Sequence, residues 1–341
     1  MTFGKRVKTA LLSAVIAALI GSLLFLILSE AVRTITITVL IMSAVIFGIA
    51  LVVGFVMEGK PSKIRVPIYA LLVVLSVIIV SSYMMYNVGK RITLPGSSDE
   101  DSYEDLCDLE AGVEQISSNG LSGWRIIATS VPENEPRPVI LYFGGNGENS
   151  SGKVAKLLDN EKLSFLYEYY DFVFIDYPTY GLSEGPLNES TLQDFTVQAY
   201  EIVSSMDTTS GITLMSYSIG NGPAMYLASK EDVDIDSMIM LAPYNSGYDL
   251  FNNYLNIFHG PLKLLVAYKL PAYRYAQDVE CPVTMIASVD DEVIPIESSR
   301  ALFSSVSSGS ANFITVSGID HNGFFSSPDV IVAIMNCLEV R

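Results

Sequence analysis

Cysteine and histidine are scarce in this sequence of 341 residues, which contains three cysteines, two histidines and one tryptophan. The cysteines (Cys107, Cys281 and Cys337) are too few and too far apart to form a disulfide framework or a zinc site. With two histidines, metal catalysis would need a site made of carboxylates alone, and no spacing of acidic residues suggests one. We therefore expect a protein that works without a metal ion.

Charged residues are absent from three long stretches near the start of the chain. Residues 9–29, 34–57 and 66–89 contain no Asp, Glu, Lys, Arg or His, and each has the roughly 20 residues that a helix needs to cross a bilayer. Residues 1–91 are thus predicted to form a membrane domain of three transmembrane helices in a lipid bilayer. The first stretch follows three basic residues, as a signal peptide does, but its length and the two later stretches favour a retained helix.

Basic residues flank these stretches unevenly, and this predicts an orientation. They lie before the first stretch and between the second and third, whereas Glu30 and Arg33 are the only charged residues of the loop after the first stretch. Because basic loops stay on the cytoplasmic side, we expect the N-terminus inside and, after an odd number of spans, the rest of the chain outside. Lys90 and Arg91 argue mildly against this. The prediction is a multi-pass protein of the cell membrane with an extracellular domain.

Basic residues are few in the rest of the chain. Residues 1–91 contain 9 of the 20 basic residues and 2 of the 37 acidic ones, so residues 92–341 contain 11 and 35. The two parts therefore carry formal charges of +7 and −24. A domain this anionic is repelled by nucleic acid and by anionic lipid head groups, so we expect no DNA or RNA partner.

The acidic part begins with a polar segment and continues as alternating strands and helices. Residues 92–111 are predicted to be an acidic linker. Residues 112–341 contain short runs that are apolar on successive residues, as in parallel strands buried on both faces. The predicted fold class is α/β, with a mainly parallel, doubly wound sheet. Residues 244–278 interrupt the alternation with aromatic and apolar residues, and they form either a small helical cap or ordinary packing on the sheet.

One predicted strand leads directly into a motif for a nucleophile. After the apolar residues 212–215 the chain continues as Ser216-Tyr-Ser218-Ile-Gly220, and a helical pattern begins near Pro223. A serine on a tight turn between strand and helix is held ready to attack a substrate. Ser218 is a better candidate than Ser216, because only Ser218 has a glycine two residues later. The usual motif has glycine where this chain has Ser216.

The candidate partners of Ser218 also follow strands. Asp290 and Asp291 come after a strand that ends near Ala287, and His321 comes after the last strand, whereas His259 lies in the expected cap. The carboxyl ends of parallel strands meet at one edge of a sheet, where such folds bind ligands. An aspartate there can orient an imidazole, which in turn activates the serine.

These segments together resemble the α/β-hydrolase superfamily, and within it the serine-aminopeptidase-like group that includes membrane-anchored members. The glycine-rich loop Gly144-Gly145-Asn146-Gly is similar to the family's His-Gly-Asn oxyanion loop, with glycine in place of the histidine. Residues 176–185 are similar to its Asp-Tyr-Arg-Gly-Tyr-Gly-x-Ser-x-Gly loop, and residues 318–322 to its histidine loop. Residues 291–295 are similar to its Asp-x-x-Val-Pro motif, which favours Asp291 over Asp290. The resemblance runs from about Gly112 to the C-terminus, so residues 112–341 are the expected α/β-hydrolase domain.

The resemblance implies a membrane-anchored serine hydrolase that cleaves an ester, thioester or peptide bond through an acyl-enzyme intermediate. Ser218, His321 and Asp291 would be its catalytic residues, and the backbone N–H groups of Asn146 and Ile219 would form the oxyanion hole. Its substrate would be a small molecule, an acyl compound or a peptide, and the implied mechanism needs no cofactor.

Two other functions remain open. The departures at Gly144 and Ser216 fit a catalytically inactive hydrolase-like domain that binds or regulates at the membrane. The helices themselves could act as a transporter or sensor, but their lack of internal charges disfavours transport, since ionisable groups inside a membrane mark ion and proton paths.

Overall fold

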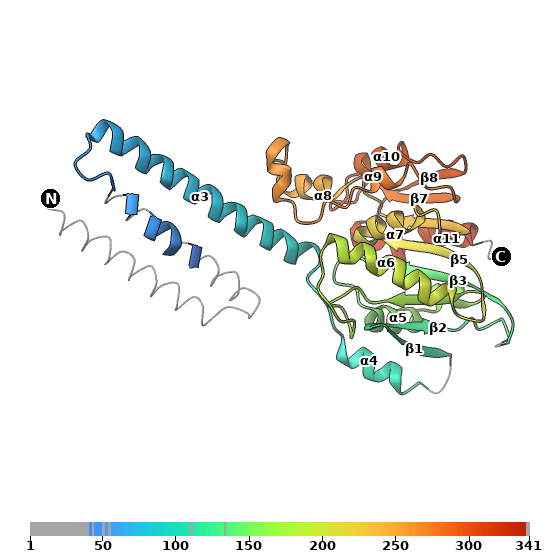
Figure 1. Ribbon diagram of the computed structural model, residues 1–341. Coiled ribbons are helices and arrows are strands. Elements are labelled where there is room, and N and C mark those ends of the chain that lie inside the picture. The colour runs from blue at the N-terminus through green and yellow to red at the C-terminus, as the bar shows by residue number, and fades with distance from the viewer. Residues whose placement is uncertain are drawn as a thin grey trace. The chain divides into compact units, whose positions relative to one another are not determined.

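The computed structural model describes residues 41–338, apart from residues 43, 50–51, 54–55, 110–111 and 133. The chain divides into two compact units between Val88 and Gly89. Figure 1 shows the elements of each unit along the chain.

The first unit contains most of the one helix of the described residues that is long and apolar enough to cross a membrane, α3 (Ser62–Thr93), which ends beyond the division at Val88. Its most apolar 18 residues have a mean hydropathy of 2.4, and none of them is buried. The expected span at residues 66–89 lies within α3. The expected span at residues 9–29 lies outside the described residues, and only parts of the span at residues 34–57 are described. Three transmembrane helices therefore stay a prediction.

The second unit is built on an eight-stranded sheet. The strands in its described part are β1 (Val113–Ser118), β2 (Leu121–Ile126), β3 (Arg137–Phe143), β4 (Asp171–Ile175), β5 (Thr209–Tyr217), β6 (Ser237–Leu241), β7 (Val283–Ser288) and β8 (Ala311–Val316). Their order across the sheet is β1-β2-β4-β3-β5-β6-β7-β8. β2 is antiparallel to β1 and β4, and all other neighbours are parallel. The predicted mainly parallel sheet is confirmed.

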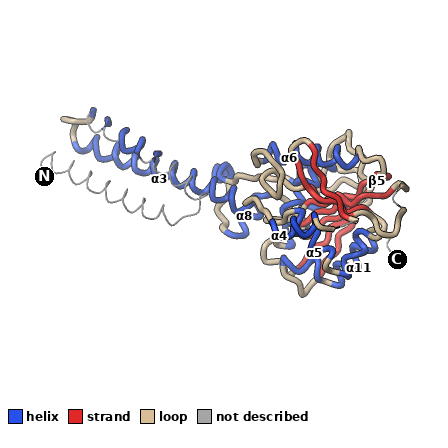
Figure 2. Tube along the Cα trace, turned by 90° about the horizontal axis from the view of Figure 1, so that it is seen from below, coloured by secondary structure: helices blue, strands red, loops and turns tan. Residues whose placement is uncertain are grey.

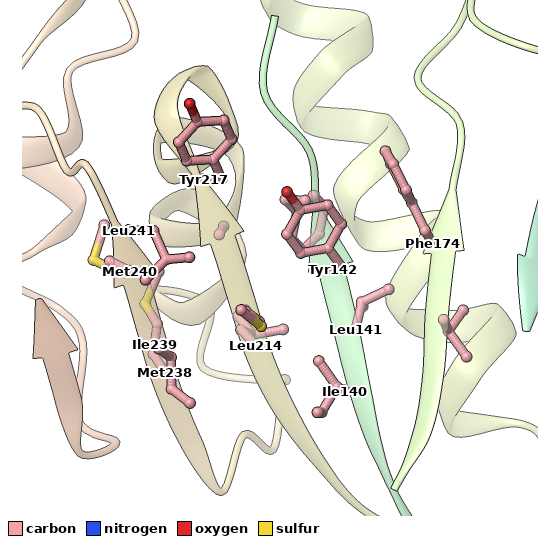
Figure 3. Close-up of a cluster of buried hydrophobic side chains, with 14 of the residues drawn as sticks. Ile140, Leu141, Tyr142, Phe174, Leu214, Tyr217, Met238, Ile239, Met240 and Leu241 are labelled. Atoms are coloured by element: carbon pink, nitrogen blue, oxygen red, sulfur yellow. The ribbon is translucent and has the colours of Figure 1, made fainter. Parts of the chain in front are cut away.

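The sequence explains both the hairpin at the edge of the sheet and the buried strands at its centre. β1 and β2 form a hairpin through Asn119-Gly120, whose φ angles of 52° and 78° suit asparagine and glycine. All of β4 is buried, as are six of the seven residues of β3, because helices cover both faces of these central strands. Figure 3 shows side chains of β3, β4, β5 and β6 packed together in this core.

Helices precede, join and follow the strands of the sheet. They are α4 (Glu100–Cys107), α5 (Ser150–Leu158), α6 (Glu189–Ser204), α7 (Asn221–Ala228), α8 (Gly247–Tyr254), α9 (Ala272–Tyr275), α10 (Ile296–Phe303) and α11 (Pro328–Cys337), with the 3-10 helices η1 (Glu161–Tyr167), η2 (Ser218–Gly220), η3 (Gly260–Leu265) and η4 (His321–Ser326). Figure 2 shows α6 on one face of the sheet and α5 and α11 on the other. α6 begins at an Asn188 capping box and buries an apolar stripe of helical spacing, including Leu192, Phe195 and Val203.

The segment expected as a linker, residues 92–111, contains α4, which packs on the second unit beside α5. Asp99 caps this helix by accepting a hydrogen bond from Ser102 N–H. Leu106 is 3% exposed, and the ring of Tyr103 packs edge-on against Trp124 at 5.7 Å between ring centres. The acidic residues of α4 face solvent, so composition concealed the apolar contacts that attach it.

Residues 244–278 fold as the short helices α8, η3 and α9. Within this segment Leu262, Leu264 and Tyr254 are exposed, whereas Phe258 and Tyr268 are buried. Part of the segment therefore packs on the domain as core, and part stands at the surface.

Candidate active site

Ser218 lies on a strained turn at the carboxyl end of β5. Its φ angle is 53°, a left-handed conformation that serine rarely adopts. The chain passes there from β5 through η2 directly into α7. A Cβ atom at Gly220 would overlap the carbonyl oxygens of Phe143 and Gly144, so only glycine fits two residues after Ser218.

Ser218, His321 and Asp291 form a hydrogen-bonded chain. Ser218 Oγ lies 2.9 Å from His321 Nε2, and His321 Nδ1 lies 2.8 Å from Asp291 Oδ2. A carboxylate oxygen accepts, so the imidazole proton sits on Nδ1 and Nε2 is left to accept from the serine hydroxyl. The other oxygen of Asp291 accepts from the N–H groups of Val293 and Ile294 at 2.9 and 2.8 Å, which holds the carboxylate in place.

The other candidates from the sequence lie elsewhere. Asp290 Oδ2 accepts a hydrogen bond from Gly318 N–H at 2.6 Å and does not contact His321. His259 lies in the exposed cap segment, with its Nε2 2.6 Å from Asn256 Oδ1. The hydroxyl of Ser216 points below the turn and donates to Asn221 Oδ1 at 2.8 Å.

Asn221 is a residue of this site that sequence reasoning missed. It is fully buried, and its Nδ2 group donates to the carbonyl oxygens of Ser218, Leu241 and Ala242 at 2.8 to 3.0 Å. Ser216, which stands where the family has glycine, supplies the donor that Asn221 Oδ1 needs. A polar residue at the start of an otherwise apolar helix was the available signal.

Tyr217 also escaped the sequence reasoning. Its hydroxyl donates to the carbonyl oxygen of His321 at 2.6 Å, and its ring stacks on the imidazole with centres 5.3 Å apart. Burial raises the pKa of Tyr217, so this hydroxyl stays protonated and remains a donor. Tyr217 thus supports the histidine loop from the residue before Ser218.

The glycine-rich loop reaches the site from the end of β3. A Cβ atom at Gly144 would lie 2.5 Å from Cζ of Phe174, so a side chain there would require the Phe174 ring to move. Asn146 is exposed, and its backbone N–H donates no hydrogen bond within the described residues. Ile219 lies in the first turn of η2, where backbone N–H groups lack partners within the helix. Both expected oxyanion donors therefore border the site.

A cleft of about 660 Å³ opens over Ser218 and His321. Apolar side chains form one part of its lining: Ile92, Leu250, Phe251, Tyr254 and Val293. Polar side chains form another: Ser97, Ser98, Asp99, Asn149 and Lys156. In the part of the chain that the structure describes, no group of three or more His, Cys, Asp or Glu side chains is arranged to hold a metal ion.

Known proteins resemble this chain in fold rather than in sequence. No protein-family model matches the sequence, and no curated protein matches it. Among solved structures, the esterase Pf2001 of Pyrococcus furiosus is 14% identical, with a TM-score of 0.55 over 73% of this chain and 96% of that one. Est1E of Butyrivibrio proteoclasticus is 14% identical, with a TM-score of 0.51 over 68% of this chain and all of that one.

An acylaminoacyl peptidase of Pyrococcus horikoshii is also similar, at 14% identity and a TM-score of 0.50 over 70% of this chain and 42% of that one. At such identities the similarity concerns the fold. Together with the strand order and the turn at Ser218, it confirms that the second unit of this chain has the α/β-hydrolase fold.

Proposed function

We propose that the second unit is a serine hydrolase in which Ser218 is the nucleophile, His321 the general base and Asp291 the residue that orients His321. The observation that carries this proposal is the hydrogen-bonded chain from Ser218 Oγ through His321 to Asp291 Oδ2. It lies at the carboxyl edge of the sheet, below an open cleft.

In this mechanism His321 Nε2 takes the proton from Ser218 as the serine oxygen attacks a carbonyl carbon. The backbone N–H groups of Asn146 and Ile219 stabilise the oxyanion that forms. His321 then gives its proton to the leaving group, which departs as an alcohol, thiol or amine and leaves an acyl-serine. A water molecule, deprotonated by His321, attacks the acyl-serine and releases the acid.

The lining of the cleft favours an acyl group with an apolar chain. Leu250, Phe251 and Tyr254 come from α8, and Ile92 and Val293 complete the apolar part. Burying a chain against such side chains releases about 0.8 kcal/mol per methylene group. The substrate proposed on this ground is an apolar acyl ester or thioester, with a peptide bond as the less favoured alternative.

The membrane part of the proposal is a multi-pass anchor. The apolar helix α3 supports one span, and the uncharged residues 9–29 and 34–57 support two more. The charge pattern of the loops supports an extracellular hydrolase domain.

Labelling with a fluorophosphonate tests the proposed chemistry, because this reagent reacts with an activated serine. Purified protein in detergent should be labelled, whereas Ser218→Ala and His321→Ala should not be. Ser117→Ala, at an exposed position of β1, serves as the control and should still be labelled. A folded wild-type protein that stays unlabelled would contradict the proposal and favour a binding domain without catalysis.

A further inference from the structure

The oxyanion loop contains a carboxylate that the proposed mechanism does not use. Glu148 Oε2 accepts hydrogen bonds from the backbone N–H of Gly145 and from the hydroxyl of Tyr142, each at 2.8 Å. Its other oxygen, Oε1, lies 3.1 Å from Nζ of Lys153. Glu148 therefore connects the loop to β3 and to α5.

Glu148 closes a turn around Asn146 from both sides. The backbone N–H of Glu148 donates to the carbonyl oxygen of Gly145 at 3.2 Å, while the side chain of Glu148 accepts from the N–H of the same Gly145. Asn146 and Gly147 lie between these two bonds, and Gly147 has a φ of 75° that such a turn accommodates at little cost. The direction of the Asn146 N–H is thereby tied to the Glu148 side chain.

The surroundings keep this carboxylate ionised. Burial by itself would raise the pKa of Glu148, but Lys153, the Gly145 N–H and the Tyr142 hydroxyl together lower it. Lys153 is itself buried, with its ammonium group 3.3 Å from the centre of the Phe325 ring. A hydrogen bond to a charged acceptor is stronger than one to a neutral acceptor, so the turn is held firmly.

We infer that Glu148 is a positioning residue, whose carboxylate fixes the turn Gly145–Glu148 so that the Asn146 N–H points at the developing oxyanion. This inference rests on the proposed function. It assigns the stabilisation of the transition state in part to a side chain that itself contacts neither Ser218 nor His321. An oxyanion donor acts only when it is directed at the reacting oxygen in advance, so a loosened turn should slow the chemical step more than substrate binding.

A graded series at position 148 tests this in the full-length protein in detergent, with 4-nitrophenyl butyrate as substrate and a fluorophosphonate as the transition-state probe. Glu148→Gln keeps an acceptor but loses the charge, and kcat should fall about tenfold. Glu148→Leu keeps neither, and kcat should fall by on the order of 10², approaching the loss of one oxyanion donor. KM should change less than threefold in both, and the rate of labelling should fall in parallel with kcat.

Two controls separate positioning from stability. Tyr142→Phe removes one partner of the same carboxylate but leaves the bond to Gly145, so kcat should stay within about threefold of wild type. Arg125→Met removes a partly buried ion pair with Asp171, which keeps Arg137 as a partner. Asp171 lies level with Ile212, and Ile212 is about 20 Å before Ser218 along β5. This variant should lower Tm without changing kcat of the folded protein.

The possible results distinguish failure of this inference from failure of the proposed function. A fall in kcat graded from Glu to Gln to Leu, at constant KM, supports the inference. If the Glu148→Leu protein keeps wild-type kcat, or loses activity only in proportion to its unfolded fraction, the inference is overturned while the proposed function stands. If the wild type is neither labelled nor active, both are overturned.

Discussion

Ser216 and Asn221 form a buried polar pair beneath the turn that holds Ser218. The Nδ2 group of Asn221 donates to the carbonyl oxygens of Ser218, Leu241 and Ala242. The amide oxygen of Asn221 accepts from the hydroxyl of Ser216. Buried polar groups that lose a partner destabilise a fold, so the pair constrains position 216. Serine at this position is therefore integrated into the structure of the turn.

Replacing Ser216 by the glycine that the family usually has should consequently destabilise this protein. We expect Ser216→Gly to lower the free energy of unfolding by about 1 to 3 kcal/mol, from the lost hydrogen bond and the added flexibility of glycine in a strand. Urea unfolding measures it. Ser117→Gly, at an exposed position of β1, is the matched control for glycine in a strand. Equal effects in the two variants would contradict the role assigned to Ser216.

Asp176, at the end of β4, makes stability depend on pH. Burial raises its pKa from 3.8 to about 6, against the opposing effect of hydrogen bonds from the N–H and hydroxyl of Ser150. Between about pH 4 and pH 6 the folded protein keeps a proton that the unfolded chain releases. Stability contributed by this group is therefore complete below pH 4 and is lost as the pH rises towards 6 and beyond.

Asp176→Asn should remove this dependence. Relative to wild type, the stability of the variant should rise by up to about 3 kcal/mol from pH 4 to pH 7, since two pKa units correspond to roughly that difference. Chemical unfolding of both proteins across this range measures the difference. A difference that stays constant with pH, or falls, would show that Asp176 is not the group responsible.

Helix α4 is attached to the domain by a few apolar contacts, although most of its side chains are polar. Four of its eight residues are Asp or Glu, and this composition is typical of a linker. Burial of Leu106 and the ring contact between Tyr103 and Trp124 attach it to the domain. Helices that carry one apolar stripe on a charged background gain their stability from packing.

Removing the buried side chain of α4 should therefore destabilise the protein more than its position within a predicted linker suggests. We expect Leu106→Ala to lower the free energy of unfolding by about 2 to 4 kcal/mol, through lost burial and the cavity left behind. Leu109→Ala is the control, because Leu109 is 45% exposed, and it should change stability by less than about 0.5 kcal/mol. Thermal unfolding of both variants decides, and equal effects would mean that α4 does not contribute to the core.

The two parts of the whole molecule differ in net charge and in hydropathy. The first 91 residues carry +7 and the remaining 250 carry −24, so the acidic part is suited to water and the apolar part to lipid. α3 is the one described helix of membrane-spanning length.

The proposed topology predicts which side of the membrane that unit occupies. Protease added to intact cells should digest the domain of residues 112–341, because three spans from an inside N-terminus leave it outside. Cells made permeable with detergent provide the control for cleavability. Protection in intact cells with digestion in permeable ones would reverse the topology and imply an even number of spans or an outside N-terminus.

Local sequence patterns determined much of this protein. Successive apolar residues predicted the buried strands, and the turn at Ser218 was recognisable from the small residues around it. The Asn119-Gly120 pair is typical of the tight turn that joins β1 and β2. These features depend on interactions between residues near one another in the chain, and the period of the apolar residues reports them directly.

Only the tertiary structure decided which polar groups meet. It brings Asp291 to His321 and directs Asp290 to Gly318 instead, and it makes Tyr217, Asn221 and Glu148 neighbours of the site. The contacts of His321 with Asp291 and Tyr217, and that of Asp290 with Gly318, join segments 28 to 104 residues apart. Each depends on strand register and on how a loop leaves its strand. A change of about 1 Å makes or breaks a hydrogen bond, and no pattern of residue types encodes a distance that small.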